Sequence, residues 1–394
     1  MKLIPEIVEN HAEMARWRRD IHKHPEMSLN ELRTASKIAE QLRSFGFDEV
    51  IEKTGYSSVI GVLKNGEGPM IGFVAAIDAQ DVQEVNEDLI YRSVNDGCMH
   101  ALGHDGEVAM LLGAAKYFAQ KRSFKGSLVF IFYSGFIGGL SARSLIEDGL
   151  FERFPVIDLF AFQSMPKLMA GKFAISAGAV MGGVAELLIK LTGRGGHAAF
   201  PNHSKNPILA AASIITSLGL LVSSRIDPAN PLLIATTSIQ SGHSFRYTPD
   251  IAELRASVRF IDPDIESWLP THTDMLVTKI AEAHRVDSMI SYRKVCAPTV
   301  NDPALARYVR DVAQDMFDYA YVQEIQPPTL IGSDISYFYN ERPGVCIGIG
   351  NAGDCELMDP CYDFNDEILP IGASLLVYIA QRILSETQSL REEK

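Results

Sequence analysis

MIGFVAAID, residues 70–78, is the stretch that decides what kind of fold this chain adopts. Its apolar residues form a short continuous run, which is typical of a parallel strand buried on both faces. Helical periodicity precedes it in residues 32–45, and residues 107–119 are expected to form a helix with Asp105 as its N-cap. Strands that alternate with helices predict an α/β domain with a largely parallel sheet covered by helices.

The same alternation continues with expected strands at 127–133 and 157–163 and a helix at 142–147. Ligands of such sheets bind beyond the carboxyl ends of the strands. The residues that directly follow the strands are therefore the first candidates for a site. They are Asp78, the loop 134–139, Gln163 and Ser164.

The pattern changes near Gly182, where strand, helix, strand, strand, helix and strand follow one another. This is the order of a ferredoxin-like domain. We therefore expect an inserted α+β domain at 183–294, and a discontinuous first domain at 1–182 and 295–394. The inserted strands are expected at 185–191, 232–240, 252–260 and 288–295, and its helices at 207–222 and 265–285.

Composition and charge bound the class of protein. A chain of 394 residues with 47% hydrophobic content is long enough for two domains. Its net charge of -13 and its lack of a basic, aromatic-rich stretch disfavour a nucleic-acid partner. The most apolar run, 208–222, is interrupted by polar residues and is expected to be a buried helix rather than a membrane span.

Targeting and cysteine use favour a cytoplasmic protein. The N-terminal segment contains Glu6, Glu9 and Glu13 and lacks the apolar core of a signal peptide. The cysteines are five in number and scattered, which suits reduced thiols better than a disulfide framework. They are Cys98, Cys296, Cys346, Cys355 and Cys361.

Motifs spread along the chain carry a resemblance to one family. The segments are WRRDIHKHPEMSLNE (17–31), MHALGHDGE (99–107), GRGGHAAFP (193–201) and YDFNDEILPIG (362–372). In order and spacing they resemble the amidohydrolase, aminoacylase and carboxypeptidase family of dinuclear metallohydrolases. The resemblance implies a zinc-exopeptidase-like domain with an inserted lid and dimerisation domain, a homodimer, and hydrolysis of N-acyl amino acids, peptides or auxin conjugates.

The residues that this family uses to hold metal are largely replaced. In its MHACGHDGH motif, Leu102 stands at the metal-binding cysteine, His104 keeps the histidine, and Glu107 takes the place of the next histidine. The remaining replacements are Ala76 at the first aspartate of a pair whose second is Asp78, Phe136 and Ile137 at both glutamates of QPAEE, Gln163 at a histidine, and Met358 at the last histidine.

These replacements remove the usual chemistry. A bound metal lowers the pKa of water from about 15.7 to about 7, and a positioned base adds roughly a hundredfold to ten-thousandfold in rate. We therefore expect no metal, no cofactor, and a drier, partly filled pocket at the apolar Leu102, Phe136, Ile137 and Met358. Random decay is the competing explanation, but the glycines, caps and strand patterns that folding needs are intact.

Several polar residues remain candidates. By resemblance, His197 matches the histidine that reaches across the dimer to the substrate, or it is structural. Arg246 could grip a carboxylate or phosphate, or it is a solvated charge. Asp78 is expected to accept hydrogen bonds from His104 or the backbone. The spacing of Cys98, His100 and His104 would suit a relocated metal, although metal sites need three or four convergent ligands.

Three functions follow from these residues. The first is a non-hydrolytic homologue whose cleft binds a small acyl-amino-acid-like ligand or a protein partner. The second is a metal-independent enzyme that uses His104, His197, Asp78 or Glu107 as acid and base. The third is a conventional amidohydrolase with an atypical metal site. Ligand contacts are expected from Arg246, Gln163, Leu102, Phe136 and Met358.

Overall fold

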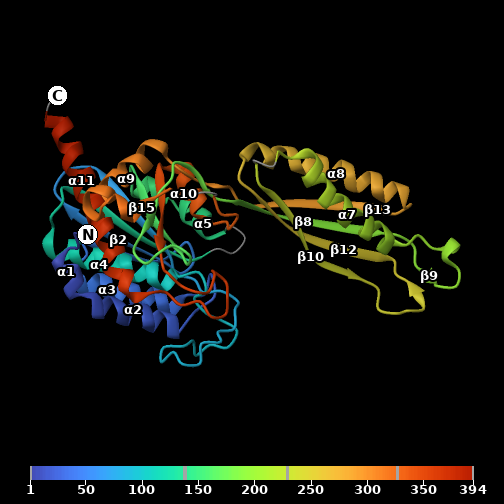
Figure 1. Ribbon diagram of the computed structural model, residues 1–394, viewed down its shortest axis with the longest axis horizontal. Coiled ribbons are helices and arrows are strands. Elements are labelled where there is room, and N and C mark those ends of the chain that lie inside the picture. Colours follow the sequence, from blue (N-terminus) through green and yellow to red (C-terminus); the bar gives the residue numbers. More distant parts are fainter. Residues whose placement is uncertain (1, 136–139, 228–229, 325–327, 393–394) are drawn as a thin grey trace. The chain divides into compact units, whose positions relative to one another are not determined.

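A computed structural model divides the chain into two compact units, each with its own hydrophobic core (Figure 1). The structure describes residues 2–135, 140–227, 230–324 and 328–392. The first unit comprises 1–180, 300–327 and 334–394, and the second comprises 181–299 and 328–333.

The segment 328–333 corrects the domain boundaries that the sequence predicted. The backbone N of Gly182 donates to Ile331 O at 3.0 Å, and Met181 forms a parallel bridge with Thr329. These pairings attach the segment to the second unit, although the sequence placed it in the first. Pairing between segments so distant in the chain leaves no local pattern to recognise.

In the described part of the chain, the first unit contains a sheet of order β1-β2-β4-β3-β5-β16-β6-β15. Neighbours β4, β3, β5 and β16 are parallel, as predicted. At one edge β1 and β2 are antiparallel, and β6 is antiparallel to β16, so the sheet is mixed. The strands are β1 (Glu49–Thr54), β2 (Ser58–Asn65), β3 (Met70–Ala76), β4 (Gly126–Tyr133), β5 (Leu159–Met165), β6 (Phe173–Ala174), β15 (Val322–Gln323) and β16 (Gly344–Gly350).

Helices cover both faces of this sheet. Successive residues of a strand point to opposite faces, so neighbouring residues pack against different helices. Phe73 belongs to the core beneath α1 to α4, α9 and α11, whereas its neighbour Val74 belongs to the core beneath α5, α6 and α10. The helices are α1 (Pro5–Glu9), α2 (His11–Lys23), α3 (Leu32–Phe45), α4 (His104–Lys121), α5 (Leu140–Glu147), α6 (Leu150–Arg153), α9 (Pro303–Phe317), α10 (Ile335–Glu341) and α11 (Leu369–Glu392).

Helix α4 begins earlier than the sequence predicted. Its N-cap is Gly103 in the left-handed region, with φ 85° and no side-chain cap bond. Asp105 is therefore not the cap but lies inside the first turn, where its carboxylate pairs with His22. This early start brings both His104 and Glu107 onto the first turn of a buried helix.

The second unit has the predicted ferredoxin-like element order. A four-stranded antiparallel sheet of order β10-β12-β8-β13 packs against α7 and α8. Asp262 and Asn206 cap the two helices through their side chains. The elements are β8 (Gly183–Thr192), α7 (Pro207–Arg225), β10 (Leu232–Ser241), β12 (Ile251–Phe260), α8 (Pro263–Ala283) and β13 (Asp287–Cys296).

Two helical stretches among the described residues are long and apolar enough to cross a membrane by length and composition alone. One is α7, whose apolar window is 28% buried, and the other is Asp366–Ser385, whose window is 72% buried. The second is a core helix of the first unit. The first packs one face on the sheet of the second unit, so the expected helix at 208–222 is present, but it is only partly buried.

Candidate functional site

Polar side chains gather where the central strands of the first unit end. Asp78 follows β3 and is only 3% exposed. His104 opens α4, and its Nδ1 lies 2.8 Å from Asp78 Oδ1 and 3.0 Å from the backbone O of Asp78. Asp78 Oδ2 also accepts from Ser28 Oγ at 3.1 Å and from Gln80 Nε2 at 3.3 Å. The expected contact between Asp78 and His104 is thus present.

Burial and the partner's charge have opposite effects on the pKa values of His104 and Asp78. Burial alone would lower the pKa of His104, but the Asp78 carboxylate raises it to about 10. Burial likewise opposes ionisation of Asp78, yet the charge of His104 keeps the pKa of that carboxyl below its usual value. The two residues therefore form a buried ion pair at neutral pH.

Glu107 lies on the same turn of α4 as His104 and is the second buried acid of the site after Asp78. Its Oε1 accepts a hydrogen bond from the backbone N of Ser164 at 3.2 Å. Burial raises the pKa of Glu107 to about 8, against the opposing charge of His104. Burial thus favours the neutral acid form of Glu107, which can donate a proton or a hydrogen bond.

Tyr362 packs beside the loop that precedes α4. Tyr362 OH lies 2.7 Å from Ser164 Oγ. A Cβ added to Gly103 would come within 2.5 Å of that hydroxyl, and Gly103 also has a positive φ. Glycine is thus needed at this position both for the backbone turn and for the approach of Tyr362.

A buried charge network that the sequence did not predict holds the site's framework. Arg18 pairs with Asp363 at 2.8 Å and Asp366 at 2.7 Å, and lies 3.7 Å from Asp105. His22 Nδ1 lies 2.9 Å from the same Asp105 carboxylate. Charged residues therefore connect the three motif segments 17–31, 99–107 and 362–372. The presence of opposite charges in these motifs was the sequence signal from which the network could have been predicted.

The proposed relocated metal group does not form. His100 is fully buried, and burial lowers its pKa to about 4, so its ring is neutral. Cys98 is a buried thiol whose pKa burial raises to about 11. Within the described ranges, no group of three or more His, Cys, Asp or Glu side chains is placed to hold a metal ion.

The other replaced positions differ in their surroundings. Leu102 is half-buried in the loop before α4, and Gln163 is half-buried on β5 with Nε2 3.4 Å from Ser164 O. Ala76 is buried in the core and not in a pocket. Met358 is 47% exposed, which corrects its expected place in a dry lining. Phe136 and Ile137 lie outside the described residues.

His197 and Arg246 belong to the second unit. His197 is exposed on β9 (Gly196–His197), which pairs with β11 (Tyr247–Thr248). The backbone O of Arg246 accepts from Ala198 N at 2.9 Å, so the two candidates are neighbours. The guanidinium of Arg246 is exposed and stacks over Phe245 at 5.6 Å. The structure brings these two together, but in a different unit from His104.

Two cysteines correct the expectation of reduced thiols throughout. Cys355 and Cys361 form a disulfide with a Cα–Cα distance of 5.9 Å. The remaining cysteines, Cys98, Cys296 and Cys346, are buried thiols. The close spacing of Cys355 and Cys361 around Met358 was the only sequence signal for the bond.

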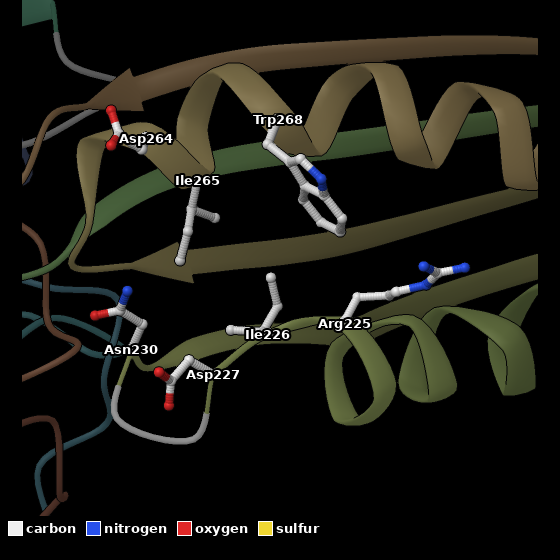
Figure 2. Close-up of a pocket in the computed structure, with 7 residues that line it drawn as sticks. All are labelled: Arg225, Ile226, Asp227, Asn230, Asp264, Ile265 and Trp268. Atoms are coloured by element: carbon white, nitrogen blue, oxygen red, sulfur yellow. The ribbon is translucent and has the colours of Figure 1, made fainter.

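A separate hollow lies in the second unit, between the end of α7 and the start of α8 (Figure 2). Ile226 and Trp268 contribute apolar surface to this pocket of about 280 Å³. No residue that the sequence singled out lines it. The lining is Arg225, Ile226, Asp227, Asn230, Asp264, Ile265 and Trp268.

Comparison with known proteins identifies the fold's relatives. The model of peptidase family M20/M25/M40 matches residues 72–382. The chain belongs to this family. It is 34% identical to a hippurate hydrolase of Campylobacter jejuni over 98% of this chain and 100% of that protein. It is 30% identical to an N-acetylcysteine deacetylase of Bacillus subtilis over 95% and 97% of the two chains.

Solved structures agree with this family membership. A dinuclear metal-binding peptidase of the M20 family from Bacillus subtilis superposes with a TM-score of 0.82 at 26% identity, over 96% of this chain and 99% of that one. A protein from methicillin-resistant Staphylococcus aureus superposes with a TM-score of 0.88 at 26% identity, over 97% and 99%. The α/β fold with its mixed, helix-flanked sheet is thus the family's fold.

The described residues do not fit the dinuclear centre that the family implies. His104 is oriented as a ligating histidine would be, since a carboxylate holds its Nδ1 and leaves Nε2 for another partner. Structural and catalytic zinc sites need three or four ligands, and at three positions where the family resemblance implies ligands the side chains are Leu102, Gln163 and Met358; in the part of the chain that the structure describes, no three His, Cys, Asp or Glu side chains are grouped to hold an ion. An alkyl group and an amide replace anionic or imidazole donors, and a thioether does not supply the missing charge.

Proposed function

We propose that this M20 family member is non-hydrolytic and that its first unit binds a small acyl-amino-acid-like molecule. The observation that carries the proposal is the pairing of His104 with Asp78, beside two positions, Leu102 and Gln163, at which the family resemblance implies metal ligands. Such a site lacks the means to make hydroxide from water near neutral pH. It retains polar groups that can hold an amide or a carboxylate.

The ligand class follows from the groups that remain. Hippurate hydrolase and N-acetylcysteine deacetylase are named for N-acyl amino acids, which carry an amide and a carboxylate. Among the described residues, none hydrogen-bonds His104 Nε2, so this N–H can donate to a ligand oxygen. The Gln163 amide offers both a donor and an acceptor. Leu102 supplies apolar surface for an acyl group.

Binding is tested by calorimetry with hippurate and N-acetyl amino acids on the full chain. We expect saturable binding without product, and weaker binding in His104→Ala and Gln163→Ala. The exposed His243→Asn is the matched control and should bind as the wild type does. If mass spectrometry detects the free amino acid that cleavage of the ligand's amide would release, the non-hydrolytic assignment is contradicted. Absence of binding to the whole panel would contradict the ligand class.

A metal-independent enzyme is the second candidate, favoured by one observation. Glu107 is a buried acid with a pKa of about 8, and groups with such shifts cluster at catalytic sites. In this case Glu107→Gln would abolish turnover of a cellular metabolite while leaving the fold intact. If untargeted assays of the wild type detect no turnover, this candidate is removed. A conventional amidohydrolase would instead cleave N-acyl amino acids once zinc, manganese or cobalt is added.

We further propose that the chain forms a homodimer through its second unit. The outward face of α7 exposes Leu209 and Leu220, and the edge strand β10 exposes Leu233 and Ile239. Exposed apolar patches of this kind mark association surfaces. Light scattering should give twice the chain mass, and Leu220→Asp should give monomers. A wild-type monomer would contradict the dimer and the cross-subunit role of His197.

A further inference from the structure

The loop between β16 and α11 is closed by a disulfide near solvent. Cys355 and Cys361 are both half-buried and bonded to each other across six residues of sequence. Within this loop, Glu356 N donates to Asp359 Oδ2 at 2.8 Å, and Tyr362 N donates to Asp359 O at 3.0 Å. The disulfide therefore closes a small turn that has few internal contacts of its own.

The base of the loop is fixed independently of the disulfide. Asn351 Nδ2 donates to Asp363 O at 2.9 Å, and Asn365 N donates to Asn351 Oδ1 at 2.7 Å. Ala352 N also donates to Leu168 O at 2.9 Å. These bonds hold both ends of the segment, and Val85 N donates to Pro360 O at 3.0 Å, so breaking the disulfide removes a covalent restraint on the turn without detaching it from the unit.

Met358, at the tip of the turn, is held in a costly conformation against the site. It has φ 70°, a region that side chains other than glycine rarely adopt, and its side chain is 47% exposed. Its backbone N donates to Ala101 O at 2.8 Å. Ala101 immediately precedes Leu102, Gly103 and His104. The closed turn thus rests on the loop that presents His104.

We propose that the Cys355–Cys361 disulfide is a reversible lock that keeps Met358 on Ala101, and that its reduction opens the turn beside His104. Cys355 and Cys361 are only partly buried residues, so a reductant can approach them more readily than the buried Cys98 and Cys346. Release of the cross-link lets Met358 leave its left-handed conformation, so opening relieves strain. The opening itself is independent of any ligand; its effect on binding rests on the proposed function.

The reductant is a dithiol, and the exchange balances in two steps. One thiolate of the dithiol attacks a sulfur of the disulfide, forms a mixed disulfide and releases the other cysteine as a thiolate. The second thiolate of the reductant then displaces the remaining cysteine and closes the reductant's own disulfide. Two electrons pass to the protein, and two protons complete the Cys355 and Cys361 thiols.

Alkylation and hydrogen exchange on the full chain test this lock, with dithiothreitol as the dithiol. Denatured without reductant, the oxidised protein should take up iodoacetamide at the three buried thiols, and after reduction at all five cysteines. In the native protein, dithiothreitol should accelerate amide exchange in the peptide 354–361 by about tenfold or more. Peptides from β3 and β4 should exchange at unchanged rates.

Variants separate the bond from general destabilisation. Cys355→Ser with Cys361→Ser should exchange in 354–361 like the reduced wild type and ignore dithiothreitol, whereas Cys98→Ala should keep the full response. Equal exchange rates in oxidised and reduced wild type would overturn the lock. So would a bond that dithiothreitol cannot reduce in the native state. Because exchange is measured without ligand, failure here is distinct from failure of ligand binding.

Discussion

The Asp78 carboxyl group occupies the position that a side chain on Gly135 would take: a Cβ on Gly135 would lie 1.7 Å from Cγ of Asp78. The Asp78 carboxylate can therefore point toward His104 only because residue 135 lacks a side chain. This residue precedes the position where Phe136 replaces a family glutamate. The pairing of His104 with Asp78 thus depends on a glycine in the loop that follows the neighbouring strand β4.

Gly135→Ala should displace the Asp78 carboxylate and break the ion pair with His104. We expect a loss of about 3–5 kcal/mol in unfolding free energy, as for other buried pairs that lose one partner. Urea denaturation measures it. Gly219→Ala is the matched control, because a Cβ there meets nothing within 4 Å, and alanine in a helix should stabilise by about 0.5–1 kcal/mol. Equal stability of Gly135→Ala and wild type would contradict the close approach.

Arg18→Met should destabilise the first unit more than any exposed arginine substitution. It removes the buried guanidinium that pairs with Asp363 and Asp366 and lies near Asp105, and breaking a buried pair in this way typically costs about 3–5 kcal/mol. Arg18→Lys should recover only part of this loss, because an ammonium cannot reproduce the guanidinium's fork of donors. Chemical denaturation of both variants checks the order. The exposed Arg143→Met should change stability by less than about 1 kcal/mol.

His22 should make stability fall with rising pH. Burial lowers its pKa, but Asp105 and Glu84 outweigh burial and raise it to about 9 from 6.5. A raised histidine pKa stabilises the fold fully below pH 6.5, and this contribution is lost as the pH rises through 9. The shift corresponds to roughly 3 kcal/mol. His22→Gln should abolish this slope between pH 6.5 and 9.5, and a slope equal to that of the wild type would contradict the charged pair.

Glu107→Gln should be most stabilising at alkaline pH. Burial raises the pKa of Glu107 from 4.5 to about 8, so ionising this acid costs stability progressively between these values. Glutamine removes that cost and still accepts the hydrogen bond from Ser164 N. Relative to wild type, the variant should gain on the order of a few kcal/mol at pH 8.5 and nothing at pH 4. A constant difference across this range would show that folding leaves the pKa of Glu107 unchanged.

The sequence predicted the elements that repeat a local pattern and the strand ends where polar residues gather. The buried run 70–77 and the periodic segment 32–45 are present as β3 and α3. Strands β1 and β2, an antiparallel pair between α3 and β3, were both missed, because the alternation of strand and helix was taken to begin at 70–77. The start of α4 was also misplaced, because Gly103 rather than a side-chain cap begins that helix.

The contacts that hold the site residues in place were the part of the structure that the sequence predicted least. Arg18 meets Asp363 and Asp366 from the opposite end of the chain, and no local pattern reports such a contact. The close approach of Gly135 to Asp78 likewise arises from the neighbouring ends of β3 and β4. What the sequence could predict was which polar residues follow the strands; their protonation, which burial and distant partners set, could not be predicted.

Metal content is the most direct test of the central claim that this site has lost its dinuclear centre. The full chain is incubated with zinc, manganese or cobalt, dialysed, and analysed by inductively coupled plasma mass spectrometry. The same samples are then assayed with hippurate. We predict substoichiometric metal, no cleavage, and no change in metal content in His104→Ala. Two metal ions per chain, lost in His104→Ala and accompanied by hippurate cleavage, would contradict the account.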